Sequence, residues 1–137
     1  LQAALSLSQA AEFVDKYPEK AAHPIAQLGR NVSGGQKQRL SIARALARRP
    51  EILIFDDSFS ALDYKTDATL REGLAKELPD TPKIIVAQRI STIRHAEKIL
   101  VLDRGEIAGM GTHDELMHFC KVYREIATSQ LSAAELA

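Results

Sequence analysis

The stretch Asn31-Val32-Ser33-Gly34-Gly35-Gln36-Lys37-Gln38-Arg39 places a hydroxyl, two glycines and an amide at the start of a helical pattern. Ser33 and Gln36 have the spacing of a capping box, in which each side chain accepts a hydrogen bond from the other residue's backbone N–H. Free N–H groups and the helix dipole attract anions at such an end. Because Gly34 and Gly35 have no Cβ, a ligand can approach the backbone closely. The tetrapeptide alone fits an anion site and an ordinary capped helix equally well.

A short apolar run ending in two acids follows this helical pattern. Ile52 to Phe55 is continuously apolar, as expected of a strand that is buried on both faces in a parallel sheet. Asp56 and Asp57 come directly after it. Ligands bind beyond the carboxyl ends of parallel strands. Two acids at this point therefore indicate either side chains that take part in a reaction or side chains that cap the following loop.

Further elements are predicted on both sides of these residues. Thr66 to Leu78 suits a helix, and Lys83 to Ala87 suits a second strand that ends at Gln88. Residues 52–87 therefore predict a strand, a helix and a parallel strand with a right-handed crossover. Residues 1–17 read as one amphipathic helix, which Pro18 ends.

The last third of the chain predicts a hairpin and a helix. Asp103-Arg104-Gly105 lies between two apolar runs, residues 99–102 and 106–110, and favours a turn. Thr112 and Glu115 have the spacing of a second capping box, which predicts a helix through about residue 128.

Three motifs together resemble one protein family. Ser33-Gly34-Gly35-Gln36 resembles the signature motif of ATP-binding cassette (ABC) ATPases, Ile52–Asp56 resembles their Walker B strand, and Ser60-Ala61-Leu62-Asp63 resembles their D-loop. From Leu1 to about Gln130 the chain is similar to the C-terminal part of an exporter-type nucleotide-binding domain. The resemblance implies an α/β fold, namely a partial P-loop NTPase (ABC ATPase) domain. Its sheet would be mostly parallel, with flanking helices and part of the helical subdomain.

The Walker A half of such a domain is absent from this sequence. No G-x-x-x-x-G-K-[ST] motif occurs, so the loop that would hold the α- and β-phosphates is missing. We expect a fragment of a longer polypeptide, inactive by itself. Residues 1–32 would belong to the helical subdomain and its link, residues 33–128 to the signature helix and ATPase core, and residues 129–137 to a frayed tail.

ATP and Mg²⁺ are the cofactors that the resemblance implies. Asp56 would position Mg²⁺ through water, since a hard cation bound to phosphate needs only one or two carboxylates. A strand-end acid that caps the next loop is the alternative for Asp56. The residues expected to contact nucleotide lie in the signature motif and the D-loop: Ser33, Gly34, Gly35, Gln36 and Asp63.

Two candidate catalytic residues depart from the family pattern. Asp57 stands where active members carry a glutamate that polarises the attacking water, and aspartate is one methylene shorter. Gln88 stands where the family's switch histidine is usual. Glutamine can hydrogen-bond a γ-phosphate but cannot take up a proton near neutrality. Together the two departures predict a degenerate site that binds ATP and turns it over slowly.

The same pattern predicts the partners. ABC domains pair head to tail, so the intact signature would complete a partner's site, while Asp57 and Gln88 would belong to this chain's own site. This is the pattern of one subunit in heterodimeric exporters, which implies a second ABC subunit, a transmembrane domain and a place at the cytoplasmic face of the cell membrane. The alternatives are a homodimeric exporter in which Asp57 is the working base, and a soluble ABC ATPase.

Composition agrees with this interpretation. Eighteen basic and eighteen acidic residues give zero net charge, so there is no electrostatic case for a nucleic-acid partner. The single cysteine, Cys120, excludes an internal disulfide and is predicted to be a small buried residue. His95, His113 and His118 form no tight ligand cluster in the sequence. The transported substrate cannot be predicted from these residues.

Overall fold

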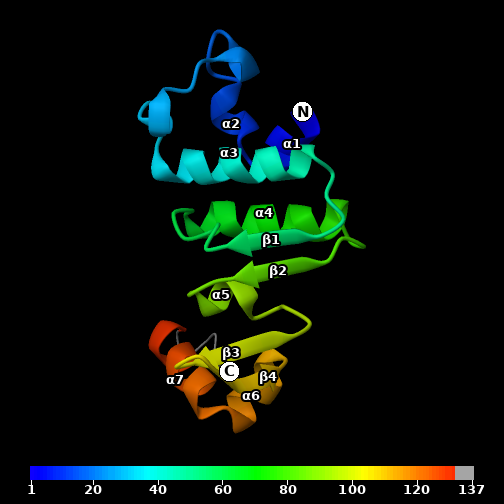
Figure 1. Ribbon diagram of the computed structural model, residues 1–137, viewed down its shortest axis with the longest axis vertical. Coiled ribbons are helices and arrows are strands. Elements are labelled where there is room, and N and C mark those ends of the chain that lie inside the picture. Colours follow the sequence, from blue (N-terminus) through cyan, green and yellow to red (C-terminus); the bar gives the residue numbers. More distant parts are fainter. Residues whose placement is uncertain (132–137) are drawn as a thin grey trace. The chain divides into compact units, whose positions relative to one another are not determined.

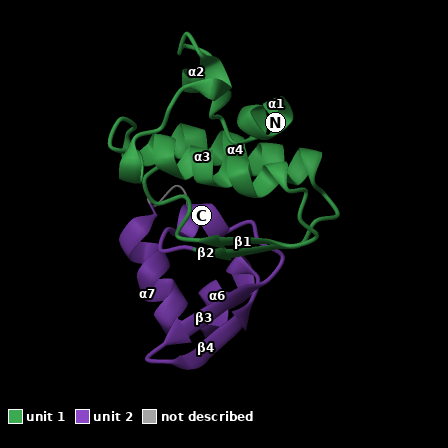
Figure 2. Cartoon of the chain, turned by 45° about the horizontal axis from the view of Figure 1, so that its top comes forward, with its two compact units in different colours: residues 1–86 green, residues 87–137 purple. Residues whose placement is uncertain are grey.

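The computed structural model describes residues 1–131, which form two compact units, residues 1–86 and residues 87 onward (Figure 2). Within residues 1–131, no helix combines the length and the apolar character that crossing a membrane requires. Figure 1 labels the elements. In unit 1 they are α1 (Gln2–Leu7), α2 (Ala11–Val14), the 3₁₀ turns Lys20–Ala22 and Gln27–Gly29, α3 (Gly34–Ala47), β1 (Leu53–Asp56), α4 (Tyr64–Glu77) and β2 (Lys83–Val86). In unit 2 they are α5 (Ile90–Ile93), β3 (Ile99–Asp103), β4 (Glu106–Gly111), α6 (His113–Phe119) and α7 (Lys121–Gln130).

The strand, helix and strand predicted for residues 52–87 are confirmed. β1 and β2 pair in parallel, with Asp56 opposite Val86, and α4 is the connection between them. Both α3 and α4 lie on one side of this strand pair (Figure 1). Leu53 and Phe55 are therefore buried, whereas Ile54 is 68% exposed. The expectation that β1 is buried on both faces is wrong within unit 1, because both long helices pack on the same face.

Unit 1 has two hydrophobic clusters, one on each side of α3. The first fills the space between the helices and the strand pair, and it contains Ile42, Leu46, Leu53, Phe55, Phe59, Leu62, Leu70 and Leu74. The second packs α1 and α2 on α3, and it contains Leu5, Ala10, Phe13, Val14 and Ala43. α3 is thus held by apolar contacts on two faces.

The single helix predicted for residues 1–17 is instead two short helices, α1 and α2. Gln9 adopts a left-handed conformation with φ of 60°, which ends the first helix. The Ser8 hydroxyl donates to the Leu5 carbonyl and accepts from the Ala10 N–H. Such local side-chain bonds compete with continued helical hydrogen bonding.

The long helices of unit 1 begin at side-chain caps. The capping box predicted for Ser33 and Gln36 is present: Gln36 N–H donates to Ser33 Oγ at 3.3 Å, and Ser33 N–H donates to Gln36 Oε1 at 2.8 Å. At the start of α4, the Asp63 carboxylate accepts from the N–H of Thr66 at 2.9 Å and from its hydroxyl at 2.7 Å. These caps satisfy N–H groups that have no partner inside the helix.

The first turn of α3 packs against the loop that precedes α4. A Cβ on Gly35 would lie 3.0 Å from the Ala61 carbonyl oxygen. A Cβ on Gly34 would meet the Ala61 Cβ at 3.8 Å, an ordinary contact distance. Gly35 therefore allows two segments of this chain to approach each other closely. This contact is a different one from the ligand approach that the sequence predicts.

Unit 2 contains the predicted hairpin. β3 and β4 are antiparallel, and Arg104 and Gly105 at the turn have φ of 48° and 85°, as expected for a two-residue hairpin loop. One face of the hairpin packs with α6 and α7 around Ile99, Val101, Leu116, Cys120, Tyr123 and Ala127. Four large apolar side chains of the two strands are exposed: Leu100, Leu102, Ile107 and Met110.

The helix predicted from Thr112 begins at its capping box with Glu115 but is interrupted at Cys120. Cys120 has extended dihedral angles, φ −94° and ψ 104°, and separates α6 from α7. Its buried sulfur lies where a Cβ on Gly109 would come within 3.0 Å. α7 reaches Gln130, and residues 132–137 of the predicted frayed tail lie outside the described residues.

We expect Gly35→Ala to be less stable than Gly34→Ala. Both changes remove a helix-position glycine, but only the methyl group at position 35 meets the Ala61 carbonyl oxygen at 3.0 Å. The free energy of unfolding of Gly35→Ala, measured by urea titration, should be lower than that of Gly34→Ala by about 1–3 kcal/mol. Equal free energies of unfolding for the two variants would show that the Ala61 loop moves aside without loss of stability.

We expect part of the acid sensitivity of the fold to come from Asp63. The N–H and hydroxyl of Thr66 donate to this carboxylate and lower its pKa. A lowered folded pKa means that the contribution is present above the ordinary aspartate pKa of about 4 and is lost as pH falls through the folded pKa. The stability advantage of the wild-type chain over Asp63→Asn, measured by urea unfolding, should therefore shrink from pH 7 to pH 2, roughly across that range.

Thr66→Val is the matched control for this measurement. It removes the hydroxyl donor but keeps the backbone N–H, so it should weaken the pH dependence without abolishing it. A difference between wild type and Asp63→Asn that stays constant with pH would contradict the assignment.

Candidate functional site

The N-terminus of α3 is open to solvent. Ser33 and Gly34 are exposed, and the side chains of Ser33 and Gln36 are engaged with each other's backbone N–H. The Gln36 N–H is thus used by the cap, and the N–H groups of Gly34 and Gly35 lie at the positive end of a 14-residue helix. This arrangement can accept an anionic group such as a phosphate.

The two predicted acids emerge where β1 ends. Asp56 is the last residue of the strand, and Asp57 turns away with φ of 48°. The Asp57 N–H still donates to the Val86 carbonyl at 3.0 Å, which extends the pairing one residue beyond the strand. Both acids are exposed. Aspartate tolerates this left-handed conformation better than most residues.

The carbonyl of Asp57 is held by its neighbours. The Ser60 hydroxyl donates to it at 2.9 Å and the Ser60 N–H at 3.3 Å. Gln38 Nε2, from the second turn of α3, donates to the same oxygen at 3.3 Å. Sequence reasoning did not find Gln38, because a glutamine on a helix carries no signal of the loop that it will meet.

Asp63 and Phe59 have structural roles in the same loop. The Asp63 carboxylate is the N-cap of α4, so its predicted nucleotide contact would have to coexist with that cap. Phe59 is buried and packs against Phe55, with ring centroids 5.1 Å apart. The loop from Asp57 to Asp63 is therefore anchored at both ends.

Gln88 belongs to unit 2, whereas the other predicted site residues all belong to unit 1. Gln88 is exposed, and its carbonyl accepts from Gln130 Nε2 at 2.8 Å. Gln130 Oε1 in turn accepts from the Ile90 N–H at 2.9 Å. The side chain of Gln130 thereby holds the loop of Gln88 against α7, a contact that joins residues 42 positions apart and leaves no local sequence signal.

Asp56 fits a magnesium ion that is bound mainly through phosphate and water. Across residues 1–131, no group of three or more His, Cys, Asp or Glu side chains could hold a metal by itself. One hard carboxylate oxygen is sufficient when phosphate and water supply the other ligands.

The His113 ring lies 2.8 Å from the Tyr123 hydroxyl, and Cys120 is buried as predicted. Burial raises the pKa of Tyr123.

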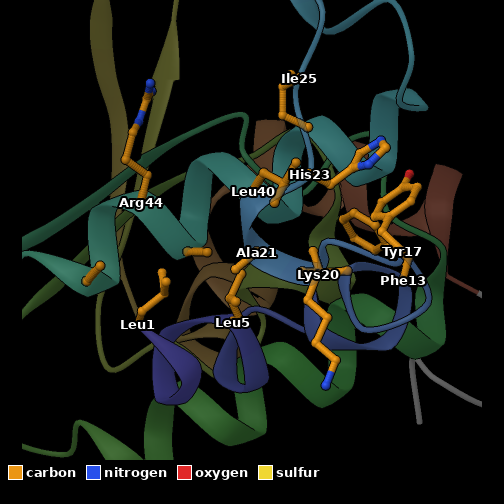
Figure 3. Close-up of a pocket in the computed structure, with 13 residues that line it drawn as sticks. Leu1, Leu5, Phe13, Tyr17, Lys20, Ala21, His23, Ile25, Leu40 and Arg44 are labelled. Carbon is orange, nitrogen blue, oxygen red and sulfur yellow. The ribbon is translucent and has the colours of Figure 1, made fainter.

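An apolar cavity of about 300 Å³ lies among α1, α2, the following loop and α3. Figure 3 shows Leu5, Phe13 and Leu40 around it, with the ring of His23 beside that of Tyr17. These two rings are stacked with centroids 3.9 Å apart. The lining includes no carboxylate and no residue of the Ser33–Gln36 turn, so this cavity is separate from the candidate site described above.

Comparison with known proteins finds similarity to ABC transporters. The sequence model of the ABC transporter family matches residues 5–60. A Mycoplasma pneumoniae protein named as an ABC transporter ATP-binding protein is 44% identical over 130 residues, which cover 95% of this chain and 21% of that protein. The ATP-dependent lipid A-core flippase of Xanthomonas campestris is 39% identical and is matched over 92% of this chain and 21% of its own length.

A solved structure agrees with these sequence matches. The structure of a bacterial Atm1-family ABC exporter with ATP bound superposes with a TM-score of 0.89 and 34% identity, over 95% of this chain and 23% of that one. The chain thus spans about a fifth of the length of the curated relatives it matches. The predicted resemblance and the predicted α/β class are confirmed: over 95% of its length the chain is similar to ABC transporter ATP-binding proteins, and it is a mixed α/β partial domain that matches the ATPase domain of an exporter.

Proposed function

We propose that this chain is part of the ATP-binding subunit of an ABC exporter, which couples ATP binding and hydrolysis to transport across a membrane. The observation that carries the proposal is that unit 1 holds both an exposed, capped helix N-terminus and two strand-end acids, Asp56 and Asp57, with Gln38 of the same helix bonded to the Asp57 carbonyl. Relatives that are a flippase and an exporter with ATP bound support it.

The start of α3 serves a nucleotide held by a partner subunit. In a head-to-tail pair, the N–H groups of Gly34 and Gly35 approach the phosphates of that nucleotide. The capping box supports this role, because it already satisfies Ser33 and Gln36 internally and orients the first turn before any ligand arrives. Preorganised donors need no rearrangement when the charge of the phosphate develops.

The acids after β1 serve this chain's own site. Mg²⁺ bound there would neutralise charge on the transferred phosphate. Asp56 would hold the ion through water, and Asp57 would hold the attacking water. The shorter reach of Asp57, together with an amide at Gln88 in place of an imidazole, makes this site slow. The partner is therefore a second, different ABC subunit whose composite site completes the cycle.

The membrane part and the location follow from this proposal. An exporter needs a transmembrane domain, in the same chain or an associated one, and its ATP-binding subunits lie at the cytoplasmic face of the cell membrane. The homology to an exporter structure and a flippase, each covered over about a fifth of its length, supports a transmembrane partner.

The slow-site proposal predicts that Asp57→Glu combined with Gln88→His accelerates hydrolysis. A longer acid and an imidazole restore reach and proton uptake, so single-turnover hydrolysis at the Asp57 site should rise about tenfold or more. The measurement uses the full-length heterodimer with the partner's own site disabled. ATP affinity, measured in parallel by equilibrium binding, should change little.

Asp56→Asn in the accelerated background is the matched control. It should abolish the gain, because the amide is a weaker ligand for the water shell of Mg²⁺. If the double variant hydrolyses ATP no faster than the unsubstituted assembly, Asp57 and Gln88 do not slow this site. Full ATPase activity from an intact homodimer of the unsubstituted protein would favour the homodimeric exporter with Asp57 as the working base.

A further inference from the structure

The side chain of Gln38 joins α3 to the loop that follows β1. Its Nε2 donates to the Asp57 carbonyl at 3.3 Å and to the Ser60 hydroxyl at 3.1 Å. Its Oε1 accepts from the Ala61 N–H at 2.9 Å. One side chain thus makes three hydrogen bonds to residues that lie 19 to 23 positions further along the chain.

The chemistry of these partners matches an amide of this length. The Ala61 N–H requires an acceptor, whereas the Asp57 carbonyl requires a donor, so the orientation of the Gln38 amide is determined by its surroundings. Glutamate at position 38 would keep the acceptor and lose both donors. Methionine would keep the length and lose all three bonds.

The bond to Asp57 acts on a residue whose backbone is unusual. Asp57 has φ of 48°, and its carbonyl accepts from Gln38 as well as from Ser60. Holding this carbonyl determines the orientation of the Asp57 peptide unit, and therefore the direction in which the Asp57 side chain leaves the backbone. Aspartate tolerates this conformation better than most residues, and the bonds from Gln38 and Ser60 add to what holds it there.

A second contact supports the connection. Gly35, one turn before Gln38 on α3, lies so close to the Ala61 carbonyl that no side chain fits between them without displacement. Steric contact and hydrogen bonds therefore act on the same loop from the same end of the helix. A movement of the first turns of α3 would be transmitted to the loop of Asp57.

We infer that Gln38 is a positioning residue that couples the Ser33–Gln36 turn at the start of α3 to the acid Asp57. This inference rests on the proposed function, in which the turn meets the partner's nucleotide and Asp57 serves the chain's own site. Gln38 acts through the Asp57 carbonyl and touches neither nucleotide. It makes the orientation of the acid at one site depend on the position of the helix that contacts the other.

The first experiment measures the connection without using hydrolysis. Hydrogen–deuterium exchange is followed in the full-length transporter for wild type, Gln38→Met and Gln38→Glu. Within residues 58–61, the Ala61 amide should exchange about fivefold faster in Gln38→Met, because this variant removes the hydrogen bond from the Ala61 N–H to Gln38 Oε1. Gln38→Glu should keep most of the protection of the Ala61 N–H. Gln2→Met, on an exposed position of α1, is the matched control and should leave these amides unchanged.

The second experiment measures the consequence for chemistry. With hydrolysis at the partner's own site disabled, Gln38→Met and Gln38→Glu should both lower kcat at the Asp57 site about fivefold, with KM for ATP within about twofold of wild type. Ser60→Ala removes another bond to the same carbonyl. Its effect on kcat should be smaller in the Gln38→Met background than in wild type, because the two residues act on one oxygen.

The outcomes separate this inference from the proposed function. Unchanged exchange of residues 58–61 in Gln38→Met would overturn the connection, whatever the ATPase activity. Faster exchange with unchanged kcat would overturn the positioning role, as would fully independent effects of Gln38→Met and Ser60→Ala. A wild-type assembly that hydrolyses no ATP would overturn the proposed function, and the exchange measurement would still decide whether Gln38 holds the loop.

Discussion

The carbonyl oxygen of Asp57 accepts hydrogen bonds from two residues, and the arrangement of unit 1 around the strand end depends on it. The chain must leave β1 in a left-handed turn while its N–H stays bonded to Val86. That turn sends Phe59 back under the strand pair, where its ring meets Phe55. The carbonyl therefore connects the polar strand end with the apolar core, and both α3 and α4 are positioned from the loop between them.

Local chemistry explains what could be predicted from the sequence. The starts of α3 and α6 were predictable because a capping box needs only two residues three positions apart. The β3–β4 hairpin was predictable because a turn ending in glycine between apolar runs favours positive φ. These features depend on neighbours in the chain, and the structure confirms them. The paired strands β1 and β2 were predictable for a similar reason, since apolar runs separated by a helical pattern form parallel pairs.

Contacts between distant residues explain what could not be predicted. The break at Gln9 is stabilised by Arg39, whose Nη1 donates to the Gln9 carbonyl at 2.9 Å from 30 residues away. At Cys120, where α6 ends and α7 begins, the cysteine sulfur packs closely against Gly109 of the preceding strand. The same limit applies to the candidate site: the acids at the end of β1 were predictable from their place after an apolar run, but Gln38 and Gln130 act through bonds that no local pattern contains.

The left-handed turn at Asp57 makes the choice between aspartate and glutamate matter for the backbone as well as for the carboxylate. Aspartate is enriched in this conformation because its short side chain can bond locally, whereas glutamate has no such preference. Exchanging the two acids at this position therefore changes the conformational energy of the backbone as well as the length of the side chain. The aspartate at position 57 thus lowers the conformational cost of the positive φ with which the chain leaves β1, so the same side chain that stands exposed at the strand end also favours the turn that follows it.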